Sequence, residues 1–572
     1  MPWQCLWCAG WLVLASGISV SAATYEVAQR NPQASDDGDG TRERPWKTIT
    51  RAAEKAGLGD TVVVRDGIYR EQVTAKTSGT AQALIQFKAA PGAHVVLTGA
   101  DRLTGWQKAE GGLPIYRVPW THRFIGWSKH MTHPDNDYHR LIGRCEQVAI
   151  DGYLLRQVLE ANQLAPGTFF VNLSNQVLQV WDLGSRDLNQ VLVEASVRQE
   201  VFQVDGDYVQ LRGLRFRFAA NMAQHGAVVL AGRHDTLEDC TIEGMNASGA
   251  TFSGEHQVVR RCVFRGNRQL GFGPMAPTTC CSPNPWSRIT IPKALTGVGR
   301  LAATSWCCAA TPSWSKAAFC AIVATASGLI LATRTVSCAS ASSRTTRIVG
   351  FFTKISLGLQ AHDNVIIGNG FATTAGAWGA QAGISISSSP ECRIERNLIL
   401  GNREGFNFRE QTRTTMRIGQ KGEAPIWNHD ETIRRNIIAV NRDAQVWGWF
   451  DMKDGHHWPA KAREGQADQV RDTPKPGDIA GAYRAKDRAG HPQGLALEKL
   501  RLSFVENVYF AEPGQGWFEW GVSWGRHKSY SKLSDFQAEL GFDLGSRVFD
   551  PGFAKLSALD CRLSAEAMAA LR

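Results

Sequence analysis

The chain has 572 residues, of which 43% are hydrophobic and 20% are charged, so it can bury a sizeable core, and collagen-like or wholly disordered chains are excluded. Its 63 Lys and Arg residues against 53 Asp and Glu residues give a net charge of +10, which would favour an acidic partner if the charge were evenly spread. However, the 107 residues between Glu255 and Asp363 contain no Asp or Glu. The basic excess is therefore not a patch, and nucleic-acid binding is disfavoured.

Residues 1–23 have the pattern of a signal peptide. Residues 5–20 are apolar and lead into a run of small residues that suits cleavage near Ala23. Residues 1–10 lack the Lys or Arg that usually opens such a segment, so a buried helix is the alternative interpretation. No later segment reaches the ~20 apolar residues of a membrane span. We therefore expect a secreted or periplasmic protein without a transmembrane segment.

Residues 24–105 are expected to form an N-terminal cap and the first coils of a repetitive β-structure. Short β-branched runs alternate with Gly, Pro and Asn turns, and one amphipathic helix is predicted between Pro45 and Ala56. The loop from Asp36 to Gly40 lacks the spaced acidic ligand of a calcium loop, which favours a solvated turn. Residues 106–200 are expected to form an insertion with additional strands.

A short pattern repeats through residues 201–455, in which a few alternating apolar residues are followed by an Asn or Gly turn. A period of about 20 to 25 residues with such strands predicts an all-β solenoid, in which equivalent residues stack ~4.8 Å apart along parallel sheets. The repeats are Tyr208 to Phe216, Thr236 to Gly244, Val258 to Asn267, Asn364 to Asn369, Arg396 to Asn402 and Arg435 to Asn441.

Cys240 and Cys262 lie 22 residues apart at matching positions of two repeats. In a solenoid they would be neighbours in a ladder of the core, which is favoured over a redox role. With Cys145, Cys392 and Cys561, the cysteines outside the signal peptide and residues 274–350 number five, which does not indicate a disulfide scaffold.

Several passages resemble secreted right-handed parallel β-helix proteins of the pectate-lyase-like superfamily. At the N-terminal end these are Asp39 to Thr41, Pro45 to Ile49 and Gly67 to Glu71; at the C-terminal end they are Phe549 to Phe553 and Asp560 to Leu563. The resemblance implies a right-handed parallel β-helix with a short N-terminal capping helix, and residues 456–572 as a C-terminal extension and closing segment. This superfamily includes polysaccharide lyases, glycoside hydrolases and non-catalytic surface proteins, so the fold alone does not give the activity. Calcium is a cofactor that only the resemblance implies, and no other cofactor is identified.

Residues 274–350 are unlike the neighbouring repeats. Ala, Ser or Thr stands at 35 of these 77 positions, and six of the 13 cysteines lie among them. We interpret residues 274–354 as DNA translated one nucleotide out of frame, so that each true codon joins the last base of one codon to the first two of the next. Under this rule Thr replaces Asn, Asp, His or Tyr, and Ala replaces Gly, Arg, Ser or Cys.

The shifted frame permits the string NENCVVRQCLIEDNEDCGIFYE at the end of the segment. It places CLIEDN where the preceding coil has Cys262 to Asn267, and in step with the repeat that resumes at Asn364. It also permits FDRGWEAGG and GIWFD, which supply acids and an arginine, and it adds on the order of fifteen acids, leaving a neutral or acidic protein. A sequencing error, a pseudogene or a real Cys/Ser/Thr-rich insertion remain as alternative origins.

The densest group of candidate site residues outside that segment begins at Arg403. Strand alternation predicts Glu404, Phe406, Phe408 and Glu410 on one face and the basic and amide side chains on the other. The predicted catalytic residues are Glu404, Arg409, Glu410 and Asp451, and the predicted substrate-binding residues are Arg403, Asn407, His429, Trp447 and Trp449. Aromatic rings beside carboxylates suit sugar binding. No metal ligands are predicted, because the adjacent His456 and His457 point apart on a strand.

Two functions from different classes fit these patterns. The first is an exported enzyme that cleaves a polysaccharide, either as a lyase with a basic proton abstractor or as a hydrolase with two carboxyl groups. The second is a non-catalytic glycan-binding or surface protein of the same fold. In both cases the partner is a polysaccharide or glycan, and the protein is expected to be a monomer.

Overall fold

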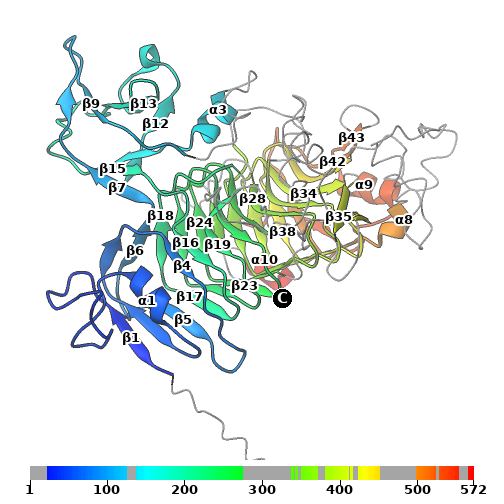
Figure 1. Cartoon of the computed structure of the whole chain (residues 1–572). Coiled ribbons are helices and arrows are strands. Elements are labelled where there is room, and N and C mark those ends of the chain that lie inside the picture. Colours follow the sequence, from blue (N-terminus) through cyan, green and yellow to red (C-terminus); the bar gives the residue numbers. More distant parts are fainter. Residues whose placement is uncertain are drawn as a thin grey trace, which may run out of the picture.

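Three long parallel sheets dominate the structure, a computed structural model of the chain. The described residues are 22–124, 137–223, 225–274, 336–339, 342–344, 349–371, 381–410, 413–416, 423–450, 497–522, 527–552 and 564–571. The chain visits sheets A, B and C in turn, so that each coil adds one strand to each sheet (Figure 1). The prediction of a mostly β chain with parallel sheets is confirmed, and the architecture is a parallel β-helix.

The strands of sheet A follow one another in chain order, and all neighbouring strands pair in parallel. Its members are β1 (Thr24–Val27), β2 (Thr61–Val64), β5 (Ile85–Ala89), β17 (Val209–Arg212), β20 (Thr236–Glu238), β23 (Gln257–Arg260), β26 (Val336–Ala339), β29 (Gln360–His362), β32 (Arg393–Glu395), β37 (Thr432–Arg434) and β40 (Ser503–Val505).

Sheet B follows each sheet A strand after a tight turn and is also parallel throughout. Its members are β3 (Gly67–Tyr69), β6 (Val95–Thr98), β18 (Arg215–Arg217), β21 (Thr241–Glu243), β24 (Val263–Arg265), β27 (Ser342–Arg344), β30 (Val365–Ile367), β33 (Leu398–Leu400), β38 (Ile437–Ala439), β41 (Val508–Phe510) and β44 (Arg547–Val548).

Sheet C completes each coil and ends in an antiparallel hairpin formed by its last two strands. Its members are β4 (Val73–Ala75), β16 (Phe202–Val204), β19 (Gly226–Leu230), β22 (Ser248–Phe252), β25 (Leu270–Pro274), β28 (Val349–Lys354), β31 (Ala382–Ser387), β34 (Glu404–Glu410), β39 (Ala444–Phe450), β42 (Phe518–Gly521) and β43 (His527–Tyr530).

Helix α1 (Ile49–Lys55) packs on the first coils. The Thr48 side chain accepts a hydrogen bond from the Arg51 N–H, and Ala56 is the C-cap residue, so the helix lies where the sequence predicts it. Its buried residues include Ile49 and Ala52, which join the same core as the strands. The remaining helices are α3 (Asp137–Arg144), η1 (Ala161–Gln163), α8 (Leu497–Leu500), α9 (Leu533–Leu540) and α10 (Ala565–Ala570).

Two smaller sheets lie beside the N-terminal end of the β-helix, at the upper left of Figure 1. Glu194, which is fully buried, bonds Arg70 at 2.6 Å and Arg217 at 3.0 Å, and so ties these sheets to the first coils. Their strands are β7 (Ala100–Leu103), β10 (Val148–Ile150), β11 (Tyr153–Leu154) and β15 (Val193–Ser196) in one sheet, and β8 (Gln107–Lys108), β9 (Ile115–Pro119), β12 (Arg156–Val158), β13 (Thr168–Asn172) and β14 (Val177–Trp181) in the other.

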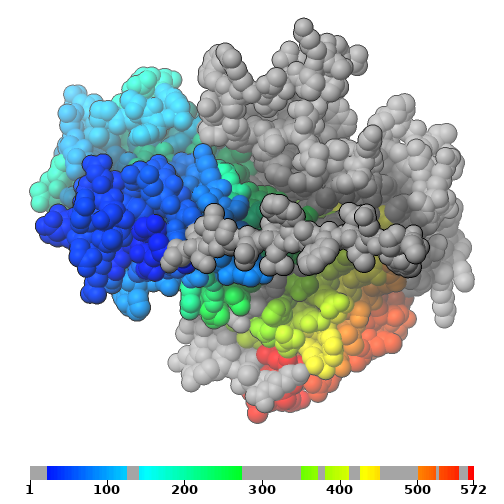
Figure 2. All heavy atoms as spheres, turned by 60° about the horizontal axis from the view of Figure 1, so that its bottom comes forward, coloured from blue at the N-terminus to red at the C-terminus, as the bar shows by residue number. Residues whose placement is uncertain are grey.

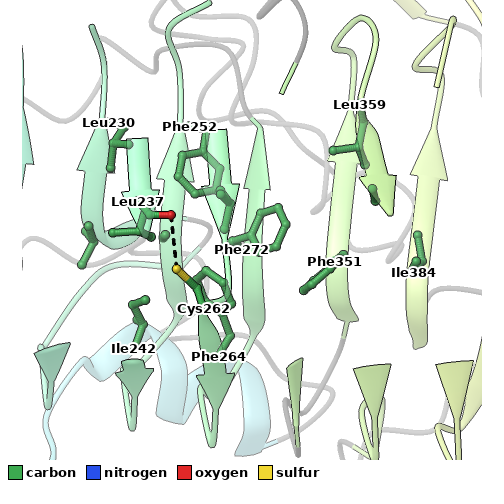
Figure 3. Close-up of a cluster of buried hydrophobic side chains, with 14 of the residues drawn as sticks. Leu230, Leu237, Ile242, Phe252, Cys262, Phe264, Phe272, Phe351, Leu359 and Ile384 are labelled. Atoms are coloured by element: carbon green, nitrogen blue, oxygen red, sulfur yellow. Dashed lines mark hydrogen bonds between the residues drawn. The ribbon is translucent and has the colours of Figure 1, made fainter. Parts of the chain in front are cut away.

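The interior of the β-helix is filled by apolar side chains that stack from coil to coil. Figure 3 shows Phe252, Phe272 and Phe351, contributed by successive strands of sheet C, pointing into this core. Cys240 and Cys262 are buried, free neighbours at the start of β21 and β24, as the sequence predicts. The Cys262 thiol donates to the Leu237 carbonyl at 3.3 Å, so both cysteines act as core residues. Figure 2 shows the coils succeeding one another along the molecule, from blue to red.

Asparagine ladders line two turns of the C-terminal coils. Asn364, Asn397, Asn436 and Asn507 are each at most 1% exposed, and each side-chain amide donates to the next asparagine's oxygen at 2.8–3.0 Å. A second ladder joins Asn369, Asn402 and Asn441 in the same way. These ladders satisfy buried backbone and side-chain groups at turns that would otherwise be unpaired.

No helix within the described parts of the chain is long and apolar enough to cross a membrane.

Candidate active site on the outer face of sheet C

The side chains of sheet C that point away from the core form a continuous layer over five successive strands, and most of them are buried. Strand register aligns two rows across it, because each residue pairs with its equivalent on the next strand. The first row is Phe352, Ser385, Asn407, Trp447 and Glu519, and the second row is Lys354, Ser387, Arg409 and Trp449. The intervening residues, such as Phe408, belong to the core. We call these two rows the outer face.

Glu404 lies on this outer face, which corrects the predicted alternation. Its strand neighbour is Ala444, which packs with Trp447 and Trp449, and its carboxylate lies 3.5 Å from the Asn407 amide nitrogen. The cause is Gly405, because a Cβ there would lie 2.6 Å from Ile438 in the core. Gly405 and Phe406 thus both face inward, and the alternation shifts by one residue. The register on both sides is unchanged, so no residue is inserted; we call this local break in the alternation the Gly405 bulge.

The environment of Glu404 favours its protonated form. Burial raises the pKa of Glu404 to about 8, with Asp443 acting in the same direction, while Arg403 and Arg409 oppose the rise. Burial dominates because the carboxyl group is 1% exposed, and loss of water penalises the charged form more than two nearby cations restore it. Glu404 is therefore mostly a proton donor at neutral pH.

Arg409 and Asn407 share the outer face with each other, as strand alternation predicts, and Glu404 lies beside them, which it does not predict. The Arg409 guanidinium lies 4.7 Å from the centre of the Trp449 ring, a distance suited to a cation–π contact. Asn407 accepts a hydrogen bond from the Ser385 hydroxyl at 2.9 Å. Both side chains are at most 7% exposed, so the local dielectric is low and their electrostatic effects are strong.

Arg403 lies in the turn before β34. It pairs with Asp443 at 2.6 Å and donates to the Gln381 side chain. These contacts tie three neighbouring coils together beside Glu404. The structure thus places Arg403 as a residue that supports Glu404, at the edge of the outer face.

Glu410 lies on the opposite side of the strand from Arg409, which separates two residues predicted to act together. It follows Phe408 in the alternation, and its carboxylate accepts a hydrogen bond from the Asn428 N–H at 2.8 Å. Its register partner, Phe450, belongs to the core. Burial, with help from nearby Glu410, raises the pKa of Glu431 well above its usual range. The two carboxyl groups therefore belong to the interior.

His429 occupies the turn between sheets C and A. Its Nδ1 lies 2.6 Å from Asp430, its ring contacts Trp427 at 4.7 Å, and burial lowers its pKa. The structure thus separates His429 from the outer face. The predicted catalytic residue Asp451 lies outside the described residues.

Two residues of the outer face were missed by the sequence analysis. Glu519 on β42 lies beside Trp447, and burial raises its pKa above the usual range. His527 on β43 has its ring centre 5.8 Å from that of Trp447, and burial lowers its pKa. The run from Asn507 to Phe510 repeats the Asn-plus-apolar pattern of Asn436 to Ala439, and this signal could have extended the solenoid to both residues.

The calcium that the family resemblance implies finds no built site in the described parts of the chain, where no three His, Cys, Asp or Glu residues gather as metal ligands would. We therefore derive no chemical step through a metal.

Comparison with known proteins supports the fold. No family model matches the chain. Over 88 residues, which are 15% of this chain and 18% of the relative, it is 41% identical to an uncharacterized protein, YwoF, of Bacillus subtilis (strain 168); the chain thus matches less than a fifth of that relative's length. The solved structure of XylC with xylose has a TM-score of 0.50 and 15% identity, over 93% of this chain and 87% of that one. The chain is also similar to a glycoside hydrolase, with a TM-score of 0.41 and 12% identity over 73% of this chain and 94% of the other. It is similar as well to the pectate lyase Pel9A, with a TM-score of 0.34 and 12% identity over 73% of this chain and 76% of the other. At such identities the likeness to XylC concerns the β-helix fold alone.

Proposed function

We propose that this chain is an exported, right-handed β-helix protein that cleaves a glycosidic bond on the outer face of sheet C, with Glu404 as the general acid. The observation that carries this proposal is a carboxyl group that stays protonated near neutral pH beside Arg409, Asn407 and two tryptophan rings. The XylC, glycoside hydrolase and lyase neighbours are compatible with it through their fold.

A hydrolase reaction fits this surface better than a lyase reaction. A glycosidase needs one carboxylic acid with a raised pKa to protonate the leaving oxygen and a second carboxylate to act on the sugar or on water. Glu404 has the first property, and Glu519 supplies a second carboxyl group on the same outer face. Their strands are two positions apart, ~9.6 Å across the sheet, and Glu519 is in register with Asn407, three residues or ~10 Å along the strand from Glu404. The two carboxyl groups would therefore act on one sugar only by extending toward each other. Arg409 would orient the substrate through its charge and through Trp449.

The experiment is a cleavage assay on a panel of polysaccharides and oligosaccharides. We expect new reducing ends with the native chain and a loss of about 100-fold or more with Glu404→Gln, the scale of general acid catalysis. Glu431→Gln is the matched control, because it replaces by an amide a second buried carboxyl group with a raised pKa, away from the outer face. Unsaturated sugar products would instead identify a lyase. Unchanged cleavage by Glu404→Gln would contradict the proposed role.

The second candidate function is non-catalytic glycan binding. The observation that favours it is the acid-free stretch, because the shifted segment would remove acids and an arginine from the protein. Glycan binding by the native chain without cleavage of any substrate, together with cleavage by a frame-restored chain, would assign the present sequence to this class.

We also propose that residues 274–354 are read out of frame. Strand register supports this reading, because Ser342 pairs with Val263 on one side and with Val365 on the other. This is the alignment that the shifted string CLIEDN requires. In the present frame, Ser343 holds the register position between Phe264 and Ile366, where the neighbouring coils place large buried side chains.

The turn residues of the neighbouring coils also support the shifted frame. Counted along the sequence from Ser342, Val263 and Val365, position 346 is equivalent to Asn267 and Asn369, and position 341 to Cys262 and Asn364. The sequence has Thr346 and Ala341 at these positions, and neither carries a side-chain amide or thiol. The shifted frame permits Asn at position 346 and Cys at position 341, which would continue both ladders.

The nucleotide sequence around the codons for Gly273 and Lys354, read from independently prepared genomic DNA, tests the frame. We expect a single-base insertion or deletion near each codon relative to a frame that encodes the ladder residues. An open reading frame that encodes the present residues in several independent isolates would contradict this proposal.

A further inference from the structure

The last coil brings three polar or aromatic side chains together beyond Glu404. Trp447 on β39 and Glu519 on β42 are register partners on the outer face. The antiparallel β43 then places Ser529 opposite Glu519 and His527 opposite Gly521. The nitrogen Nε2 of His527 lies 3.5 Å from the Glu519 carboxylate. Gly521, with no side chain, is the register partner of Trp449.

Two nitrogens of this group are buried without a hydrogen-bond partner in the described structure. They are Nε1 of Trp447, whose side chain is 7% exposed, and Nε2 of His527. A buried indole N–H without an acceptor costs about 1–3 kcal/mol, and native proteins rarely keep such a group without a reason. An oxygen atom of a bound ligand would accept a hydrogen bond from this indole N–H.

The charge of the group decides what kind of ligand fits. Ser529 donates to Glu519 at 2.7 Å, and the remaining carboxylate oxygen is an acceptor for hydroxyl groups. The neighbouring cation, Lys528, pairs with Glu539 and is the register partner of Trp520, a core residue. A uronate would bring its own negative charge against Glu519, whereas a neutral sugar offers hydroxyl donors, acceptor oxygens and an apolar face for Trp447.

We infer that Trp447, Glu519 and His527 form a subsite that binds a neutral sugar unit of the substrate, next to the position where Glu404 acts. This inference rests on the proposed function and deepens it, because it names a neutral glycan as the substrate class. Hydroxyl groups donate to Glu519, and ring or hydroxyl oxygens accept from Trp447 and His527.

Calorimetric binding of neutral and uronic oligosaccharides to the full chain tests the subsite. Trp447→Phe keeps the aromatic ring and removes the N–H, and Glu519→Gln removes the charge. We expect each to weaken binding of a neutral oligosaccharide about 10-fold, or about 1.4 kcal/mol, and we expect Lys528→Gln to leave it unchanged. Circular dichroism and thermal unfolding of each variant show whether its fold is retained.

Different results separate this inference from the proposed reaction. Glu404→Gln should lose cleavage while it keeps binding, because it lies outside the subsite. Equal binding by Trp447→Phe, Glu519→Gln and the native chain overturns the subsite, whatever the cleavage assay shows. Tighter binding of uronic than of neutral oligosaccharides overturns it as well. Neutral-sugar binding that needs Trp447 and Glu519, without any cleavage, would support the subsite and refute the reaction.

Discussion

Glu404 combines burial with two nearby arginines, and burial has the larger effect on its pKa. If its protonated form is the active one, cleavage is retained below pH 8 and falls as the pH rises through the pKa of about 8. We expect this alkaline limb in the pH dependence of kcat/KM, measured between neutral and alkaline pH. The residual activity of Glu404→Gln should lack the limb; a limb of the same shape in that variant would assign it to another group.

Asp235 gives a stability prediction at the same scale. Burial raises its pKa to about 8, and its carboxyl oxygen accepts from the Val209 N–H at 3.0 Å. The folded pKa of Asp235 lies above its unfolded value. The protonated carboxyl group therefore stabilises the folded state fully below pH ~4, and this stabilisation is lost between pH ~4 and the folded pKa of about 8. We expect Asp235→Asn, which stays neutral, to flatten the decline of the denaturation midpoint over this range. A decline as steep as in the native chain would contradict the assignment.

Residue positions on the outer face could be predicted from sequence only where strict alternation holds. Asn407 and Arg409 were placed correctly because they follow Phe406 and Phe408 in a regular strand. Glu404 was assigned to the wrong face because a glycine bulge leaves no mark in a period of two. A single Gly inside a strand is itself a signal for such a bulge.

At the scale of the element, Gly405 holds the strand in the shape that turns Glu404 outward. A Cβ at position 405 would lie 2.5 Å from the Gln445 carbonyl and 2.6 Å from Ile438. We expect Gly405→Ala to lower the free energy of unfolding by about 1–3 kcal/mol, the range for overpacking, and to reduce cleavage. Urea denaturation and the cleavage assay measure the two effects.

The matched control for that change is Gly57→Ala. A Cβ there meets only the Asp60 carboxylate, at 3.5 Å, which is ordinary van der Waals contact, so stability and activity should change little. If Gly57→Ala and Gly405→Ala changed stability and cleavage equally, the bulge would not be what places Glu404 on the outer face.

Coils could be predicted where an asparagine follows a short apolar run, since both features recur with the period of the helix. The coil containing β40, β41 and β42 escaped recognition because 52 residues separate Phe450 from Ser503, which hides the period. The two sheets at residues 100–196 have no repeat, and their pairing depends on contacts far apart in sequence. Asp451 and the centre of the acid-free stretch lie outside the described residues, so what the sequence indicates for them stays a prediction.

At the scale of the whole molecule, three long connections leave the β-helix after strands of sheet C. Four residues separate Phe252 from Gln257, but 61 separate Pro274 from Val336 after the next strand of sheet C. The hairpin of β35 (Arg413–Met416) and β36 (Glu423–Ile426) also follows a strand of that sheet. Functional residues gather where long connections leave a rigid scaffold, and two of these three follow β34 and β39, which carry residues of the outer face.

The stacking of coils has a thermodynamic consequence. Each coil contacts only its neighbours, so the stability of such an array is a sum of coil terms and nearest-neighbour coupling terms. The coil of β26, β27 and β28 couples the two halves, and in the present frame it places Ser343 between the larger apolar partners Phe264 and Ile366. A weak coupling term at one position divides a one-dimensional cooperative system into two melting units.

Differential scanning calorimetry of the native chain should therefore show two heat-absorption peaks. A frame-restored chain should show one peak at a higher temperature, because the repaired coil couples the halves. A single peak in both chains would show that cooperativity passes through this coil in either frame. The ratio of van't Hoff to calorimetric enthalpy then measures how many coils melt together.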